Sequence, residues 1–255
     1  MNMKQFHVLV LPGVFILLFF IFHASAFAAE VNCLKCHAKL TIGKSVHKAL
    51  NSGCTTCHTG IDASTVPHKK TNVLAKGLSS AEPDLCFGCH DKELFAKKDV
   101  HPAIASGCTI CHNPHSSKNP KLLTTAVPAL CFSCHDKAIF TKKNIHPPVA
   151  AGECMTCHTP HSSNEMALLV TKPIDVCLQC HTDTSHGKHI SSNQQQSNGQ
   201  GGEKKEESEP QDPKRPGKPF YCGSCHDPHS TDSPVLFRFN AQSVQDLCVN
   251  CHKMN

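Results

Sequence analysis

Hydrophobic residues form one long run near the N-terminus, and beyond it they occur only in short groups between polar stretches. The run extends from Val8 to Phe22, follows Lys4 and precedes Ala26-Phe27-Ala28. A basic start, an apolar centre and an A-x-A site are typical of a secretory signal peptide. We predict a signal peptide at residues 1–28, cleaved near Ala28. The alternative is a retained membrane anchor, for which fifteen residues interrupted by Pro12 fall short of the about 20 that a spanning helix needs.

The short apolar groups that follow predict short helices joined by loops. Three of these groups come directly after a proline, at Pro83, Pro128 and Pro173. Proline suits the first turn of a helix, so each group is expected to begin a short helix. The predicted fold class is mainly α and irregular, with little or no sheet. The chain has no Trp and one Tyr, so side chains alone do not describe a conventional core.

The pentapeptide Cys-x-x-Cys-His occurs nine times and uses all eighteen cysteines. It is the attachment motif of c-type haem, whose vinyl groups bond to the two thiols while the adjacent imidazole binds the iron. We therefore predict nine covalently attached haem c groups. The predicted attachment residues are Cys33, Cys36, Cys54, Cys57, Cys86, Cys89, Cys108, Cys111, Cys131, Cys134, Cys154, Cys157, Cys177, Cys180, Cys222, Cys225, Cys248 and Cys251. The predicted proximal iron ligands are His37, His58, His90, His112, His135, His158, His181, His226 and His252.

Two simpler explanations of the cysteines account for less of the pattern. Structural zinc is usually held by two facing Cys-x-x-Cys hooks, so nine hooks would leave one unpaired. A disulfide framework explains an even cysteine count but gives no reason for a histidine after every motif. Haem attachment explains both features. With the cofactor as the interior, the chain without haem is expected to be largely unfolded.

The remaining histidines match the number of haems. Of twenty histidines, nine belong to the motifs and two lie in the predicted signal peptide, which leaves nine. Some follow a motif histidine by three residues, which is too close for them to reach the opposite face of that haem. Each of these is expected to ligate a different haem and so to tie adjacent units together. The predicted distal ligands are His47, His68, His101, His115, His146, His161, His186, His189 and His229.

Two of these distal assignments leave alternatives open. His186 and His189 could each serve the haem at Cys177, the haem at Cys222 or the C-terminal haem. If one of them is no ligand, one iron has an open or weakly held site. Mature methionines are scarce, so His/Met ligation is at most an exception. No catalytic residue is predicted.

The motifs are arranged in repeated pairs. Phe95–Ser117 aligns with Phe140–Ser163, which indicates an internal repeat of roughly 45 residues. Leucine pairs recur just past the second motif of a unit and are interpreted as haem-packing residues. Residues 190–219 lack hydrophobic periodicity and are rich in Gln, Ser, Gly and Pro, which predicts a disordered insertion. The predicted units are 29–76, 77–120, 121–166 and 167–235 with two haems each, and the half unit 236–255 with one.

The formal net charge of +5 changes meaning once the cofactor is counted. Each haem carries two propionates, so nine haems would make the loaded protein acidic. The recurrent lysine pairs are therefore expected to form a solvated or propionate-pairing face rather than a nucleic-acid site, and no nucleic-acid partner is predicted. These pairs are Lys69/Lys70, Lys97/Lys98 and Lys142/Lys143.

The doubled motif, with His-Pro before the second copy and Cys-His-x-Pro-His-Ser at its end, resembles the multihaem cytochrome c families with doubled motifs. These include the periplasmic decahaem subunits of porin-cytochrome conduits and the pentahaem donors to periplasmic nitrite reductase. The resemblance implies an extended chain with short helices around stacked bis-His haems. The chain departs from these families in having nine motifs, a divergent first unit and the insertion at 190–219.

On this resemblance the chain is expected to be a periplasmic electron carrier, not an enzyme. Its expected partners are a quinol-oxidising donor or small cytochrome at one end and a terminal reductase or outer-membrane complex at the other. Membrane association is expected only through these partners. Three other functions remain open: a reductase with one open haem, a membrane-anchored quinol dehydrogenase subunit, and an extracellular filament subunit.

Overall fold

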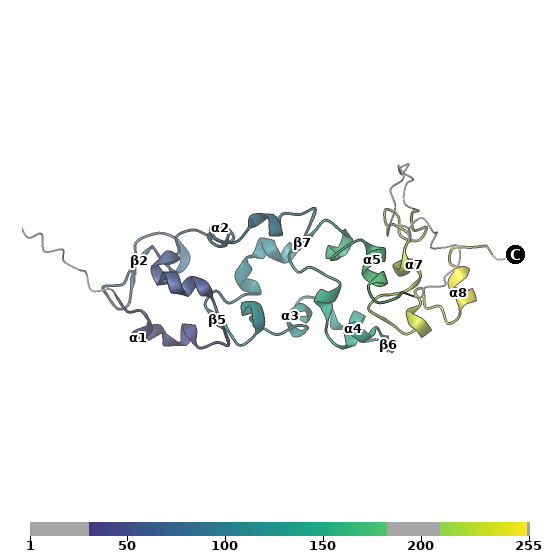
Figure 1. Ribbon diagram of the computed structural model, residues 1–255, viewed down its shortest axis with the longest axis horizontal. Helices are drawn as coiled ribbons and strands as arrows, with labels where there is room; N and C mark the ends of the chain where they lie inside the picture. Colours follow the sequence, from purple (N-terminus) through teal and green to yellow (C-terminus); the bar gives the residue numbers. More distant parts are fainter. Residues whose placement is uncertain (1–30, 183–209, 254–255) are drawn as a thin grey trace, which may run out of the picture. The chain divides into compact units, whose positions relative to one another are not determined.

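The helices are all short, and most carry part of a Cys-x-x-Cys-His motif (Figure 1). The computed structural model describes residues 31–182 and 210–253, so the predicted signal peptide and the first part of the predicted insertion lie outside it. Contacts divide the chain into Met1–Asn32 and Cys33–Asn255, and the elements described all belong to the second unit. The α-helices are α1 (Leu34–His37), α2 (Asp84–Phe87), α3 (Ala129–Phe132), α4 (Pro147–Ala150), α5 (Pro173–Leu178), α7 (Cys222–Cys225) and α8 (Val244–Cys248).

The prolines act as the sequence predicts. Pro83 and Pro128 cap the N-terminal ends of α2 and α3, and Pro173 is the first residue of α5. Tighter 3-10 turns occupy much of the chain between the α-helices. They are η1 (Ala38–Thr41), η2 (Lys48–Ser52), η3 (Cys54–Thr56), η4 (Ala75–Gly77), η5 (Lys92–Phe95), η6 (Pro102–Ser106), η7 (Cys108–Ile110), η8 (Pro120–Leu122), η9 (Lys137–Phe140), η10 (Cys154–Thr156), η11 (Met166–Leu168) and η13 (Pro234–Leu236).

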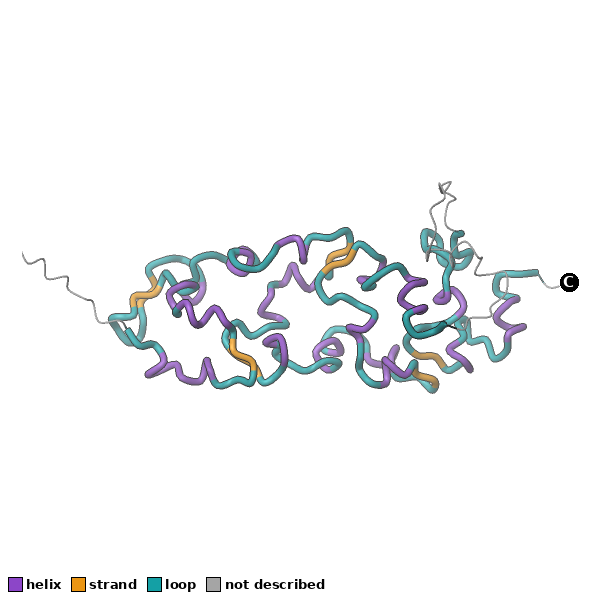
Figure 2. The backbone as a smooth tube through the Cα atoms, viewed as in Figure 1, coloured by secondary structure: helices purple, strands orange, loops and turns teal. Residues whose placement is uncertain are grey.

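Each strand in the described part of the chain has two residues. They are β1 (Ser45–Val46), β2 (Ile61–Asp62), β3 (Lys69–Lys70), β4 (Asp99–Val100), β5 (Ser116–Ser117), β6 (Asn144–Ile145), β7 (Ser162–Ser163) and β8 (Ser230–Thr231). They form four antiparallel two-stranded sheets, β1 with β5, β2 with β3, β4 with β7 and β6 with β8. Figure 2 shows how little of the trace is strand. The predicted class, mainly α and irregular with little sheet, is confirmed.

Three of the four sheets join one repeat to the next. In each, one strand lies directly before the first predicted distal histidine of a unit. Its partner strand lies directly after the predicted distal histidine that follows the second motif of the next unit. Two serine side chains reinforce these sheets. The Ser162 hydroxyl donates to the Leu94 carbonyl at 2.9 Å, and the Ser230 hydroxyl donates to the Ile139 carbonyl at 2.9 Å. Neighbouring repeats are therefore held together mainly by polar contacts.

The first repeat closes on itself at its outer side. Strand β2 has the place that β5, β7 and β8 have in later units, but it pairs with β3 of its own unit. Ile61 lies opposite Lys70, and Asp62 lies opposite Lys69. The divergent sequence of this unit thus forms a local hairpin where later units pair with a preceding repeat.

Very few apolar side chains are buried by the polypeptide itself. Within the described residues, only Phe237 and Ala241 are buried hydrophobic residues, at 8% and 2% exposure. Many large apolar side chains are exposed, among them Val46, Val100 and Ile145 at 46%, 42% and 36%, each directly before a predicted distal histidine. Since burial of apolar surface is the main driving force of folding, the protein atoms alone lack the core that a stable fold needs. This agrees with an interior supplied by a cofactor.

The last ten residues of the predicted insertion form a closed loop, which differs from the disorder expected there. The Asp212 carboxylate is 3% exposed and accepts hydrogen bonds from the backbone of Lys214 and Arg215 and from Arg215 Nε at 2.7 Å. Gln211 and Pro219 form a bridge that closes the loop. A polar sequence can order in this way because one buried carboxylate satisfies several donors at once.

No helix among the described residues has both the length and the apolar character needed to cross a bilayer.

Replacing Ser230 with Ala should destabilise the haem-loaded protein by about 1 kcal/mol, because the Ile139 carbonyl and the Lys142 N–H would each lose their bond to the buried Ser230 hydroxyl. Denaturant unfolding followed by circular dichroism measures this difference. Ser64→Ala is the matched control, since that exposed hydroxyl donates to the Asp62 side chain two residues away and lies outside every motif. Equal stability of the two variants would contradict the role given to Ser230.

Candidate haem-binding sites

All nine Cys-x-x-Cys-His motifs have the same local backbone turn. In each, the histidine N–H donates to the carbonyl of the first cysteine, at distances from 2.9 to 3.1 Å. First motifs of a unit lie on or beside α-helices, whereas Cys54, Cys108 and Cys154 begin 3-10 turns. All eighteen cysteines are free thiols, so no disulfide competes for them. The turn keeps the two thiols and the imidazole of each motif together.

Seven motif histidines each face one of the predicted distal histidines. The ring centroids of every pair lie 6.0 or 6.1 Å apart. No pair joins two motif histidines or two distal ones. The pairs are His37 with His68, His90 with His47, His58 with His115, His135 with His101, His112 with His161, His181 with His146, and His158 with His229.

Six of the seven pairs join neighbouring repeats. The first unit, for example, presents His47 to His90 of the second, which in return presents His115 to His58. The two distal histidines of each exchange are also bonded through their backbones. His47 N–H donates to the His115 carbonyl at 2.8 Å, His101 N–H to His161 at 2.8 Å, and His146 N–H to His229 at 3.0 Å. Only His37 and His68 pair within one unit.

The structure does not place every predicted ligand. His186 and His189 lie outside the described residues, so their assignment stays a prediction. The other seven distal histidines are all found opposite a motif histidine. Histidines three residues from a motif histidine face a different motif, as expected from their short spacing.

Backbone carbonyls orient both kinds of histidine. The Nδ1 atoms of His47 and His68 lie 2.9 Å from the Pro114 carbonyl and 2.7 Å from the Thr65 carbonyl. A carbonyl only accepts, so Nδ1 must carry the proton and Nε2 is left with a free lone pair. Metal-binding histidines are commonly fixed in this way by a bond on the other ring nitrogen.

The second motif of every unit uses one recurring turn for the same purpose. A residue in the left-handed backbone region directs its carbonyl at Nδ1 of the motif histidine. The carbonyl of the next residue in the turn accepts a hydrogen bond from a backbone N–H just after the motif. Asn113 N–H, for example, donates to the Leu122 carbonyl at 2.8 Å. The Nδ1 partners are Lys76 for His58 at 2.9 Å, Lys121 for His112 at 2.8 Å, Ala167 for His158 at 2.9 Å and Val235 for His226 at 2.8 Å.

The sequence does not predict this turn from its residue types. Leu122, Leu168 and Leu236, which are expected to pack on haem, also have left-handed backbones, with φ of 59°, 58° and 59°. The preceding residues Lys121, Ala167 and Val235 have φ of 55°, 53° and 43°, and in the first unit Gly77 takes the place of the leucine. A leucine ten residues after the motif histidine in the second, third and fourth units is the signal that points to the turn.

Burial keeps the distal imidazoles in the neutral form that binds metal. Burial is the largest cause that lowers the pKa of His101, His115, His146 and His161, and the facing motif histidine is the second largest. A lowered pKa means that the proton is lost more readily from the second ring nitrogen.

Successive motifs lie beside one another along the whole chain. At each of the eight steps from one motif to the next, a thiol of one acts on a thiol of the other. Burial and the Cys108 thiol, for instance, raise the pKa of Cys86 to about 12. With haem attached these sulfurs are thioethers that no longer titrate, so the contacts serve here as evidence of proximity. Thiol hydrogen bonds join Cys33 with Cys54, Cys86 with Cys108, Cys131 with Cys154, and Cys177 with Cys222. At the four steps between them the interaction is electrostatic, between Cys57 and Cys86, Cys111 and Cys134, Cys157 and Cys180, and Cys225 and Cys251.

The donor set fits haem. Two imidazoles bound to one iron from opposite sides would have centroids about 6 Å apart, given metal–nitrogen bonds of about 2 Å. Each pair supplies only two donors, and the described residues contain no group of three or more His, Cys, Asp or Glu that could hold a metal ion. A porphyrin supplies the four remaining nitrogens, and the neighbouring thiols can bond to its vinyl groups.

A protein-family model matches most of the chain. The family described as the doubled CXXCH motif matches residues 47–94, 101–140, 146–197 and 215–255, which together make up more than half of the chain. No curated protein matches the chain.

Substituting Ala167 tests the orienting turn. Pro fixes φ near −65°, so Ala167→Pro should break the left-handed turn and remove the carbonyl from His158 Nδ1, where it lies at 2.9 Å. We expect one low-spin haem signal to change its g values in electron paramagnetic resonance (EPR). Ala167→Gly is the matched control, because glycine adopts positive φ freely; it should keep every signal and raise stability by up to about 1 kcal/mol. Unchanged g values in the Pro variant would rule out this role.

Proposed function

The chain belongs to the doubled CXXCH motif family and is a multihaem c-type cytochrome; from this premise we propose that it is a nine-haem electron carrier. Each haem is held by one motif histidine and one distal histidine. Haem c supplies the one-electron chemistry, and the polypeptide sets ligation, spacing and local charge.

The facing imidazole pairs are the observation that carries the proposal. Seven motif histidines have a second imidazole at the separation expected across one iron. An iron with two imidazoles is coordinatively saturated and has no position for a substrate. Such a centre exchanges electrons but does not bind small molecules, which favours a carrier over a reductase.

The contacts between motifs support a path in sequence order. Each motif interacts with the next through a thiol pair from Cys33 to Cys251, by a hydrogen bond at four steps and electrostatically at the other four. Haems attached at these sites would follow one another as the motifs do along the chain. We propose that electrons travel between the haem of the first motif and that of the ninth through all the others.

The polypeptide has two tasks along this path. The exchanged distal histidines hold each repeat at a fixed position against its neighbour, because neither repeat contains both ligands of its second-motif iron. The carbonyls on Nδ1 prevent the imidazoles from rotating and keep Nε2 directed at the metal site. Both effects limit the rearrangement that accompanies electron transfer.

The proposed setting is the periplasm, because c-type haem is attached outside the cytoplasm in bacteria and residues 1–28 resemble a signal peptide. We propose redox proteins as partners at the two ends: a quinol-oxidising donor or small cytochrome, and a terminal reductase or outer-membrane cytochrome complex. An acidic loaded protein would favour basic docking surfaces on these partners.

Low-temperature EPR of the oxidised, fully loaded protein tests the proposal. Integration should give nine low-spin ferric haems and no high-spin signal, because every iron would have two strong ligands. One haem's worth of high-spin signal would show an open site and favour a reductase instead. A haem count below nine by mass spectrometry would overturn the stoichiometry.

His146→Met tests a single ligand pair. Because His146 faces His181, the variant should alter only the haem attached at Cys177 and Cys180. That haem should gain a sulfur-to-iron charge-transfer band and a higher reduction potential, while the haem count stays at nine. Lys143→Met, an exposed change on the same segment, puts a methionine where no iron is expected and should produce no charge-transfer band. No change in any haem of the His146 variant would remove this residue from the ligand set.

A further inference from the structure

The fourth repeat has an ion pair where the other repeats have neutral residues. Asp227 directly follows the second-motif histidine, as Asn113 and Thr159 do in the second and third units. Arg238 donates its backbone N–H to the carbonyl of the second motif cysteine at 2.9 Å, as Thr124 and Val170 do. These backbone positions are therefore equivalent, and only in this repeat do they carry opposite charges, with Arg238 Nη1 3.4 Å from Asp227 Oδ2.

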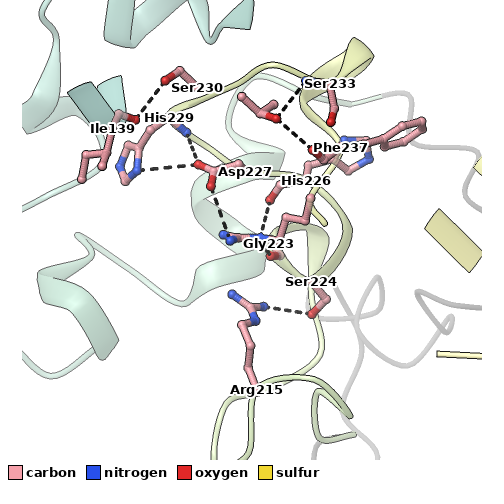
Figure 3. Close-up of polar contacts among 12 residues, drawn as sticks. Ile139, Arg215, Gly223, Ser224, His226, Asp227, His229, Ser230, Ser233 and Phe237 are labelled. Carbon is pink, nitrogen blue, oxygen red and sulfur yellow. Dashed lines mark hydrogen bonds and ion pairs between the residues drawn. The ribbon is translucent and has the colours of Figure 1, made fainter. Parts of the chain in front are cut away.

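The Asp227 carboxylate faces a predicted distal ligand. Its Oδ1 atom accepts from the His229 backbone N–H at 3.0 Å and lies 3.9 Å from His229 Nδ1 (Figure 3). Asn113 Oδ1 makes the same backbone bond to His115 at 3.0 Å. An uncharged amide oxygen therefore makes the same bond in the second repeat. The charge is an addition peculiar to Asp227.

Arg238 fixes the carboxylate in place. Its Nε donates to the Gly223 carbonyl at 2.6 Å and to the His226 carbonyl at 3.2 Å, so the guanidinium is anchored on the motif Cys222–His226. Asp227 and Arg238 have side chains only 28% and 24% exposed, which limits screening by water. The negative end of the pair is directed at His229 and the positive end at the neighbouring motif.

We propose that Asp227 lowers the reduction potential of the haem held by His158 and His229, relative to the equivalent haems of the preceding repeats. This inference rests on the proposed function, in which those two imidazoles ligate one iron. Ferric haem carries one more positive charge than ferrous haem, so a fixed carboxylate beside a ligand stabilises the ferric form. Asp227 is here a positioning and tuning residue that acts through His229.

The two charges of the ion pair lie differently with respect to His229. Asp227 Oδ1 is 3.9 Å from His229 Nδ1, whereas the Arg238 guanidinium bonds to the Gly223 and His226 carbonyls. The carboxylate is therefore the charge that faces the imidazole.

Asp227→Asn in the haem-loaded full-length protein is the direct test. Asn113 shows that asparagine makes the same backbone bond, so the variant removes the charge and keeps the turn. In a potentiometric titration followed by EPR, one of the nine reduction steps should move to a more positive potential. The other eight should stay unchanged.

Two further variants separate a local effect from a change in net charge. Asn113→Asp is the reciprocal change and should move a different step, that of the haem held by His58 and His115, to a more negative potential. Asp232→Asn removes a charge from an exposed carboxylate of the same turn, which accepts only from the Lys143 backbone at 3.1 Å. It should move no step.

The outcomes distinguish this inference from the proposed function. If Asp227→Asn keeps nine low-spin haems and no step moves, or if Asp232→Asn moves a step equally, the tuning role is overturned while the electron carrier stands. If the wild-type protein lacks a low-spin haem at the His158 and His229 pair, the proposed function itself fails. In that case the tuning inference fails with it.

Discussion

Two imidazoles that face each other from neighbouring repeats are the interaction on which this structure depends. The second and third repeats each give one histidine to the unit before and another to the unit after, as His115 and His101 do for the second repeat. The short strands, the serine bonds and the backbone bond between exchanged histidines all lie beside these pairs. Secondary structure therefore serves mainly to keep ligands in position. This explains why elements of two to six residues are sufficient.

The scarcity of buried apolar residues has the same origin. A chain that encloses porphyrins needs side chains that line them, and these appear exposed when only protein atoms are counted. Val46, Val100 and Ile145 show the pattern, since each precedes a distal histidine and leaves its side chain uncovered by protein. Stability would come from covalent attachment, iron ligation and contact with the haem faces. A hydrophobic core built from Phe237 and Ala241 alone could not replace them.

Much of the fold class and the candidate sites could be predicted from the sequence, because the chemistry of haem attachment fixes residue type and spacing. The prolines at the starts of α2, α3 and α5 predicted short helices. The number of histidines outside the motifs and the predicted signal peptide equals the number of motifs. The partner of each distal histidine could not be predicted, since it depends on contacts between repeats rather than on spacing. The left-handed turns could not be predicted either, because lysine, alanine and valine occupy the position where glycine would be the expected residue. The burial of Asp212 could not be predicted either, because the composition of its segment indicated disorder.

The forward and backward exchange of histidines has a consequence for how such chains change length. Removing or duplicating one internal repeat would leave every remaining imidazole with a partner, because the new neighbours offer the same two histidines to each other. Removing half a repeat would leave one iron without its second ligand. The hairpin of β2 and β3, with His68 beside it, closes the exchange at the first unit and needs no earlier repeat. The architecture is therefore modular in steps of one repeat with two motifs, and gene duplication could lengthen the chain without redesigning its first unit.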